Sequence, residues 1–388
     1  MTLIDAPDGL PPDATCGHRP TSKRKVAFQA RSTCSSKMMN NLMSKSNRHE
    51  RPNVVRPNVN VRSDNTPFSF NPEEKEVNGS VAQHPEKMVG TWRTRLSVYL
   101  VALRPWSFTA SMTPVLLGSS LAYQATGHCD VWNLLITCYT ALAVHAAGNL
   151  VNTYFDYMKG VDSKKSDDRT LVDHILSPND VATMGAICYM AGCLGFLALV
   201  FVSPAKLEHL ALIYFGGLSS SFLYTGGLGL KYIALGDIAI FLTFGPVTVL
   251  FAFLSQAGTL SWSPLLYAIP LAMNTETILH SNNARDMEAD RLAGIVTLPI
   301  LVGETGSYLV FTLLLFGPYI MFTVMAMNVS SWFLLPMMTV FQAFKYEKRF
   351  RDGHLIGMPQ QIAKLNLQLG LAYVAACIMA QREKLPGL

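Results

Sequence analysis

The sequence predicts an all-α, polytopic integral membrane protein with a disordered N-terminal tail. Half of the 388 residues are hydrophobic and only 15% are charged, whereas soluble domains carry roughly 25% charged residues. Between residues 97 and 380 the apolar residues form long runs, several of which exceed the roughly 18 residues that a membrane-spanning helix needs. Short polar stretches separate these runs and are expected to be loops.

Residues 1–92 differ in composition and are expected to form a disordered, polar and basic tail. They are rich in Pro, Asn, Ser, Lys and Arg, and such a segment cannot bury enough apolar surface to offset its chain entropy. The tail lacks the apolar core and cleavage site of a secretory signal. Acidic residues near its start (Asp5, Asp8, Asp13) disfavour a mitochondrial transit peptide. Residues 93–388 are expected to form the membrane domain.

Nine candidate spans make up this domain. In chain order they cover residues 97–123, 131–154, 181–202, 207–224, 236–255, 264–281, 308–327, 332–344 and 362–380. The eighth is short for a span. Several spans contain an internal proline, such as Pro114, Pro246, Pro270 and Pro318, which membrane helices tolerate because neighbouring groups satisfy the freed backbone carbonyl.

The polar loops differ between the two sides of the predicted membrane. Basic residues gather in the loops after spans two, four, six and eight, namely Lys159, Lys164, Lys165, Arg169, Lys231, Arg285, Arg291, Lys345, Lys348, Arg349 and Arg351. The loops after the odd spans hold one basic residue, Lys206. The positive-inside rule therefore places the N-terminus and the even loops in the cytosol, and the C-terminus across the membrane. Most acidic residues lie on the same cytosolic side.

Two acidic motifs stand at this face. The first motif, Asn152 and Asp156, closes the second span, and Asp162 follows it in the loop. The second motif, Asp286 and Asp290, closes the sixth span with the same spacing. Residues four apart project from one face of a helix, so each motif presents its oxygen atoms together.

This pattern favours divalent-metal and phosphate chemistry. Oxygen-only ligands suit Mg²⁺, which completes its coordination shell with water and substrate phosphates, and bound metal makes a diphosphate a better leaving group. Nearby Lys159, Lys231 and Arg285 are candidate phosphate contacts. One motif alone is also typical of a helix cap, but two matched motifs at one membrane face favour function. None of the seven cysteines forms a CxxC pair, which disfavours thiol-redox chemistry.

The two motifs resemble those of the UbiA family of membrane prenyltransferases. The stretches Leu-Arg-Pro-Trp-Ser-Phe at 103–108, Gly-Asn-Leu-Val-Asn-Thr-Tyr at 148–154 and Ile-Leu-His-Ser-Asn-Asn at 278–283 are similar to the animal members that make menaquinone-4. Many relatives carry Asp where this chain has Thr153, so the first motif has one carboxylate fewer.

The resemblance implies nine transmembrane helices around a central cavity, and Mg²⁺-dependent transfer of geranylgeranyl from its diphosphate to a naphthoquinol, reduced menadione. It implies endoplasmic reticulum and Golgi membranes, with the active site facing the cytosol and a sterol-pathway reductase as a partner; a mitochondrial membrane is disfavoured. The catalytic set is Asp156, Asp286 and Asp290. The metal ligands are Asn152, Asp156, Asp162, Asp286 and Asp290. The diphosphate contacts are Lys159, Lys231, Arg285 and Asn283.

Other functions remain open at this point. A benzoquinone precursor of the ubiquinone pathway is an alternative acceptor, and a non-catalytic sterol- or isoprenoid-sensing scaffold is a further alternative. A cation-coupled transporter is disfavoured, because its ion sites usually lie near the membrane midplane. No nucleic-acid partner is expected.

Overall fold

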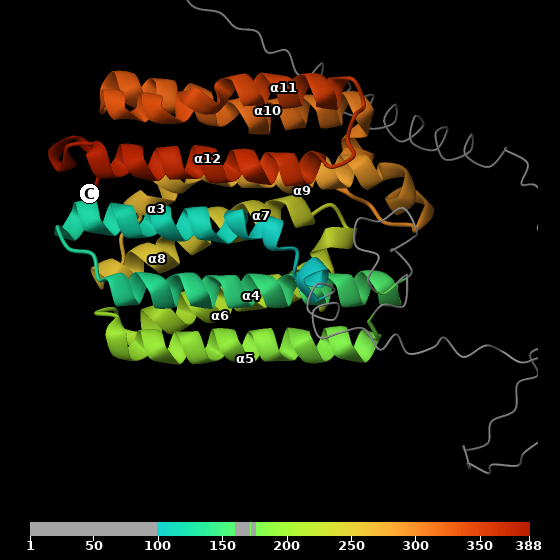
Figure 1. The fold of residues 1–388 in the computed structure, drawn as a ribbon, viewed down its shortest axis with the longest axis horizontal. Coiled ribbons are helices and arrows are strands. Elements are labelled where there is room, and N and C mark those ends of the chain that lie inside the picture. Colours follow the sequence, from blue (N-terminus) through green and yellow to red (C-terminus); the bar gives the residue numbers. More distant parts are fainter. Residues whose placement is uncertain (1–98, 160–170, 172–175) are drawn as a thin grey trace, which may run out of the picture. The chain divides into compact units, whose positions relative to one another are not determined.

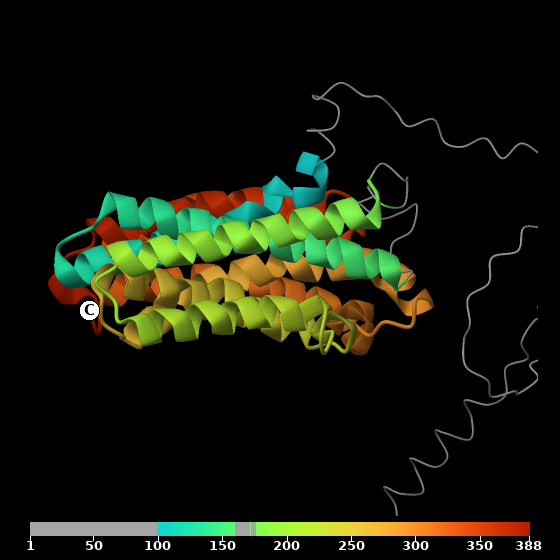
Figure 2. The ribbon, with the colours of Figure 1, turned by 90° about the horizontal axis from the view of Figure 1, so that it is seen from below.

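The structure, a computed structural model, describes residues 99–159, 171 and 176–388. The predicted tail 1–92 and the candidate ligand Asp162 lie outside these residues. The described part is built from helices that run side by side (Figures 1 and 2), which confirms the predicted all-α class. The elements in chain order are η1 (Pro105–Phe108), α3 (Thr109–Thr126), α4 (Val131–Met158), α5 (Pro178–Val202), α6 (Leu207–Thr225), η2 (Leu230–Tyr232), α7 (Gly236–Leu242), the π-helix η3 (Thr243–Val247), α8 (Thr248–Ala257), α9 (Ser263–Leu292), α10 (Leu298–Asn328), η4 (Ser331–Thr339), α11 (Val340–Arg351), α12 (Met358–Met379) and η5 (Arg382–Lys384).

The described residues of every predicted span fall largely on helical elements, although three boundaries differ. The first span is interrupted at Arg104, whose φ of 51° reflects the bar on helical geometry before Pro105. Helix α9 extends to Leu292, beyond the predicted end at 281, because its polar residues continue the helix out of the apolar run. Helix α10 begins at Leu298 and has a non-helical break at Gly303, which explains why apolar periodicity alone placed its start at 308.

Five of the described helices, counting α7 to α8 as one, are long and apolar enough to cross a membrane: Val131–Met158, Pro178–Val202, Gly236–Ala257, Leu298–Asn328 and Met358–Met379. The count of nine spans stays a prediction. Large apolar side chains such as Phe201, Leu212 and Phe341 are exposed on the described surface. Such exposure is typical of contact with lipid acyl chains rather than water.

Hydrogen bonds between loops and helix ends show which segments lie together at each end of the described part. At one end, Asp130 before α4 accepts from Gln256 of α8, and Gln124 of α3 donates to Ala380 at the C-terminal end of α12. At the opposite end lie the C-terminal ends of α4, α6 and α9 (Figure 1). The first motif is on α4, the second is on α9, and Lys231 follows α6. The C-terminus therefore lies at the end away from the motifs, as the positive-inside argument predicted.

Backbone hydrogen bonds fix the loop after α6 against the loop after α9. The N–H of Ala234 donates to Val296 O at 2.7 Å, and the N–H of Val296 donates to Tyr232 O at 3.2 Å. Within the second loop, the N–H of Ile295 donates to Asp290 O at 2.9 Å. These bonds tie η2, and thus Lys231, to the end of the helix that carries the second motif.

Candidate active site

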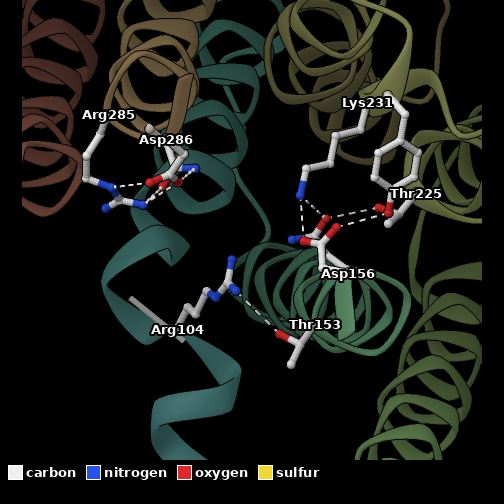
Figure 3. A network of polar contacts seen from close by, with 10 residues as sticks. Arg104, Thr153, Asp156, Thr225, Lys231, Arg285 and Asp286 are labelled. Carbon is white, nitrogen blue, oxygen red and sulfur yellow. Dashed lines mark hydrogen bonds and ion pairs between the residues drawn. The ribbon is translucent and has the colours of Figure 1, made fainter. Parts of the chain in front are cut away.

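The first motif is held by an ion pair that crosses from α4 to η2. Lys231 Nζ lies 2.5 Å from Asp156 Oδ2 and donates to Asn152 Oδ1 at 3.1 Å (Figure 3). Thr225 Oγ1 also donates to Asn152 Oδ1, at 3.3 Å. The Asp156 and Lys231 side chains are only 4% and 13% exposed. One ammonium group thus binds both oxygen-bearing residues of the motif, because their i, i+4 spacing places them on one helix face.

Tyr232 completes the surroundings of the first motif. Its hydroxyl donates to Asp156 Oδ1 at 2.9 Å, so both carboxylate oxygens of Asp156 have partners. Lys159 Nζ lies 3.6 Å from the centroid of the Tyr232 ring, a cation–π contact. Two basic residues therefore flank the first motif, and Tyr232 orders both the carboxylate and one of the cations.

The second motif has its own basic partner on the same helix. Arg285 binds both carboxylate oxygens of Asp286, with Nε at 2.8 Å and a terminal nitrogen at 2.7 Å (Figure 3). Asn282 accepts from Arg285 at 3.0 Å and donates to Asp286 at 3.3 Å. This planar two-bond pairing is the strong form of an arginine–carboxylate contact.

The carboxyl group of Asp290 interacts electrostatically with charged residues of both motifs. It lies in the polar end of α9, past the predicted span 264–281, and is 7% exposed. Burial raises the pKa of its carboxyl to about 6; Lys231 lowers this pKa, and the carboxylates of Asp286 and Asp156 raise it further. The negative charge at this position is thus incompletely compensated by the protein.

The oxygen-rich end fits a divalent cation. Every candidate ligand is an amide or carboxylate oxygen, the donor type that Mg²⁺ prefers, and the raised pKa of Asp290 indicates that added positive charge is favourable there. Among the described residues, no three His, Cys, Asp or Glu side chains form a ready-made metal cluster. A cation bound here would need ligands from elsewhere, such as water or phosphate oxygens, which is usual for Mg²⁺.

A cavity of about 230 Å³ lies among the helices next to the first motif. Its wall includes the polar residues Asn152, Lys231 and Asn282 and apolar residues such as Ile213 and Phe251. A pocket of this form can hold a polar head group beside the polar residues and an apolar chain against the apolar ones.

Of the predicted site residues that the structure describes, Asn152 and Lys231 line the cavity. Its lining residues do not include Asp156, Lys159, Arg285, Asp286 or Asp290. Asn283 is buried outside its wall. The neighbouring Asn282 lines it instead, because adjacent helical residues point about 100° apart. Asp162 lies outside the described residues.

Three residues near the site were not predicted from the sequence as site residues. Tyr232 is a partner of Asp156, and its position next to Lys231 was the only available signal. Arg104 lines the cavity and donates to Thr153 Oγ1 at 3.4 Å. In the sequence, Arg104 stands out only as part of the stretch 103–108, and its contact with Thr153 becomes apparent only in the folded chain. His145 also lines the cavity.

Comparison with known proteins defines the family. The profile of the UbiA prenyltransferase family matches residues 111–354. The UbiA prenyltransferase domain-containing protein 1 homolog of Drosophila melanogaster is 56% identical over 317 residues, covering 80% of this chain and 87% of that protein. The Homo sapiens UbiA prenyltransferase domain-containing protein 1 is 57% identical over 297 residues, covering 76% and 88%.

Solved structures agree on the fold. A UbiA homolog from Aeropyrum pernix K1 has a TM-score of 0.56 at 13% identity, covering 69% of this chain and 97% of that one. A UbiA homolog from Archaeoglobus fulgidus, bound to DMAPP and Mg²⁺, has a TM-score of 0.50 at 14% identity, covering 71% and 99%.

The helical fold and the motif-bearing cavity are those of an integral membrane prenyltransferase. The chain belongs to the UbiA prenyltransferase family.

Proposed function

We propose that this protein transfers a geranylgeranyl group from its diphosphate to a naphthoquinol ring, forming menaquinone-4, with Mg²⁺ at the two acidic motifs. The observation that carries this proposal is that both motifs lie at the end of the helices where Asn152, Lys231 and Asn282 line a largely apolar cavity. A diphosphate fits beside these polar residues, and an isoprenyl chain fits the apolar wall. The Archaeoglobus homolog is bound to DMAPP and Mg²⁺, which supports a prenyl diphosphate and a divalent metal as the ligands.

Each site residue has a role in this proposal. Asn152, Asp156, Asp286 and Asp290 hold the metal, and Asp162 adds an oxygen from the loop. Lys159, Lys231 and Arg285 contact the diphosphate, and Asn282 takes the place predicted for Asn283 because it lines the cavity. Bound Mg²⁺ supplies charge neutralisation at the leaving diphosphate. The apolar wall excludes water, so that the allylic cation meets the ring rather than hydroxide.

The cellular setting is proposed from the resemblance to animal members. The enzyme acts in endoplasmic reticulum and Golgi membranes with the motifs facing the cytosol, and a sterol-pathway reductase associates with it. Residues 1–92 form a tail separate from the membrane domain 93–388; the family match within 111–354 supports this division. Organelle fractionation and co-purification of the reductase test location and partner.

The test of substrate identity is a transfer assay with the purified full-length chain in lipid vesicles. Prenyl diphosphates of several lengths are offered with reduced menadione or 4-hydroxybenzoate. We expect the highest kcat/KM for geranylgeranyl diphosphate with the naphthoquinol. Asp156→Ala is expected to abolish product, and the exposed Asp352→Ala serves as the matched control. A preference for 4-hydroxybenzoate would instead indicate a role in the ubiquinone pathway. The absence of product with every pair of prenyl diphosphate and acceptor would favour the sensing scaffold.

A further inference from the structure

The cavity contains polar groups that an isoprenyl diphosphate does not need. Beyond its diphosphate, an isoprenyl chain has no atom that forms hydrogen bonds. Yet Ser107, Ser111, His145 and Asn149 all line the cavity away from the two motifs. These buried groups are paired within the protein, as burial requires: both serines contact His145, and Asn149 donates to Leu103 O and Ser107 Oγ. Together they form a polar strip in an apolar wall, which offers hydrogen bonds to a second ligand that carries hydroxyl or carbonyl groups.

The position of His145 matches that second ligand. His145, Asn149 and Asn152 recur at helical spacing on α4, and all three line the cavity. With 1.5 Å of rise per residue, His145 lies about 10 Å along the helix from Asn152. An acceptor ring that reacts with the first carbon of the prenyl chain must lie beyond the diphosphate, in this part of the cavity.

The hydrogen bonds around His145 fit the neutral tautomer that carries its proton on Nε2. Ser107 Oγ lies 2.8 Å from Arg104 O, to which it donates, and it accepts from Asn149 Nδ2 at 3.1 Å. In this tautomer Ser107 Oγ also accepts from His145 Nε2 at 3.2 Å, and Ser111 Oγ donates to Nδ1 at 2.5 Å. With its proton committed to His145, the Ser111 oxygen retains lone pairs that can accept one more hydrogen bond.

The walls around this pair suit a flat ring. The His145 ring contacts Phe108 edge-on, at 5.4 Å between centroids, and Phe244 in a tilted arrangement, at 4.7 Å. Phe244 lines the cavity and belongs to the π-helix η3. Insertions of this kind within α-helices occur frequently at functional sites, and aromatic side chains favour stacked or edge contacts with a ligand ring.

We infer that Ser111 binds a hydroxyl group of the acceptor ring and that His145 is the positioning residue that orients Ser111. The ring hydroxyl donates to Ser111 Oγ, and Ser111 donates to His145 Nδ1. This assignment rests on the proposed function, because it presumes that an aromatic hydroxyl compound is the acceptor.

The experiment compares variants of the full-length chain in lipid, with reduced menadione and geranylgeranyl diphosphate. Ser111→Ala is expected to raise the KM for the quinol about tenfold, the effect of one lost hydrogen bond. Its Kd for the diphosphate is expected to stay within about twofold of the wild-type value. Ser111→Thr keeps the hydroxyl and is expected to restore most of this loss. His145→Phe is expected to raise the same KM, while His209→Gln, near the start of α6, is the control.

A ligand lacking the hydroxyl separates recognition from general damage. The dimethyl ether of reduced menadione is measured as a competitive inhibitor of the wild type and of Ser111→Ala. We expect the same Ki for both proteins, because the ether has no proton to donate to Ser111. An equal loss of affinity for quinol and ether, an unchanged quinol KM in Ser111→Ala, or a parallel rise in diphosphate Kd would overturn the assignment. A wild type without transfer activity would instead refute the proposed function.

Discussion

Replacement of Lys231 by Met separates the stability of the site from its catalysis. In the wild type, Lys231 Nζ contacts Asp156 Oδ2 and Asn152 Oδ1 at 2.5 and 3.1 Å. Lys231→Met keeps the length of the side chain but removes the ammonium group from the buried Asp156 carboxylate, which retains the Tyr232 hydroxyl as a neutral donor among the described residues. The double variant Lys231→Met with Asp156→Asn removes the unpaired charge as well.

The expected magnitudes follow from burial. Breaking a buried ion pair by removing one partner costs about 3–5 kcal/mol, and the remaining Tyr232 bond together with the open cavity places Lys231→Met nearer 2 kcal/mol. The double variant is expected to recover most of this loss, which corresponds to a coupling energy of about 2 kcal/mol. Activity is expected to fall about 10²–10³-fold in Lys231→Met, the usual effect of removing a donor to developing charge, with no recovery in the double variant.

The assay combines thermal unfolding in detergent with prenyl transfer in vesicles for the wild type, both single variants and the double variant. Stability that recovers while activity stays low supports two separate roles for Lys231. Lys231→Met with unchanged stability, or with full transfer activity, would refute the claim that this ion pair is desolvated and acts on the diphosphate.

Three further predictions follow from the same geometry. Tyr232→Phe keeps the ring but removes one hydrogen bond to the first motif, so kcat/KM should fall only about 3- to 10-fold; a loss above 100-fold would contradict this role. Mg²⁺ should raise the Tm of the wild type by mass action but not that of the Asp286→Asn, Asp290→Asn double variant, and an equal rise in both would place the metal elsewhere. Gly118→Ala should lower the stability by about 1–3 kcal/mol, because the added Cβ overlaps the neighbouring helix α8. Gly216→Ala, whose Cβ meets nothing within 4 Å, is its control and should lose no stability.

The fold class and the location of the polar chemistry were predictable because both depend on local composition. Apolar runs indicated the helices, and basic loops indicated that the motifs share one end. The apolar run of α9 ends at residue 281, and the i, i+4 spacing of Asp286 and Asp290 was the signal that the helix continues, as it does to Leu292.

The individual contacts of the site depend on the folded chain and were less accessible. The pairing of Lys231 with Asp156 joins residues 75 positions apart, and the sequence offered several other cations. The choice between Asn282 and Asn283 depends on the rotation of α9. The polar wall at Ser111 and His145 was not identified at all, because isolated polar residues in an apolar run are common in packed helices.

The central claim is that both acidic motifs act on one prenyl diphosphate, and one measurement tests it most directly. The purified full-length chain in vesicles receives geranylgeranyl diphosphate and reduced menadione, with Mg²⁺ or with a chelator. Product is expected only with Mg²⁺, and Asp156→Ala and Asp286→Asn should each abolish it. Metal-independent product, or full activity in either variant, would contradict the account.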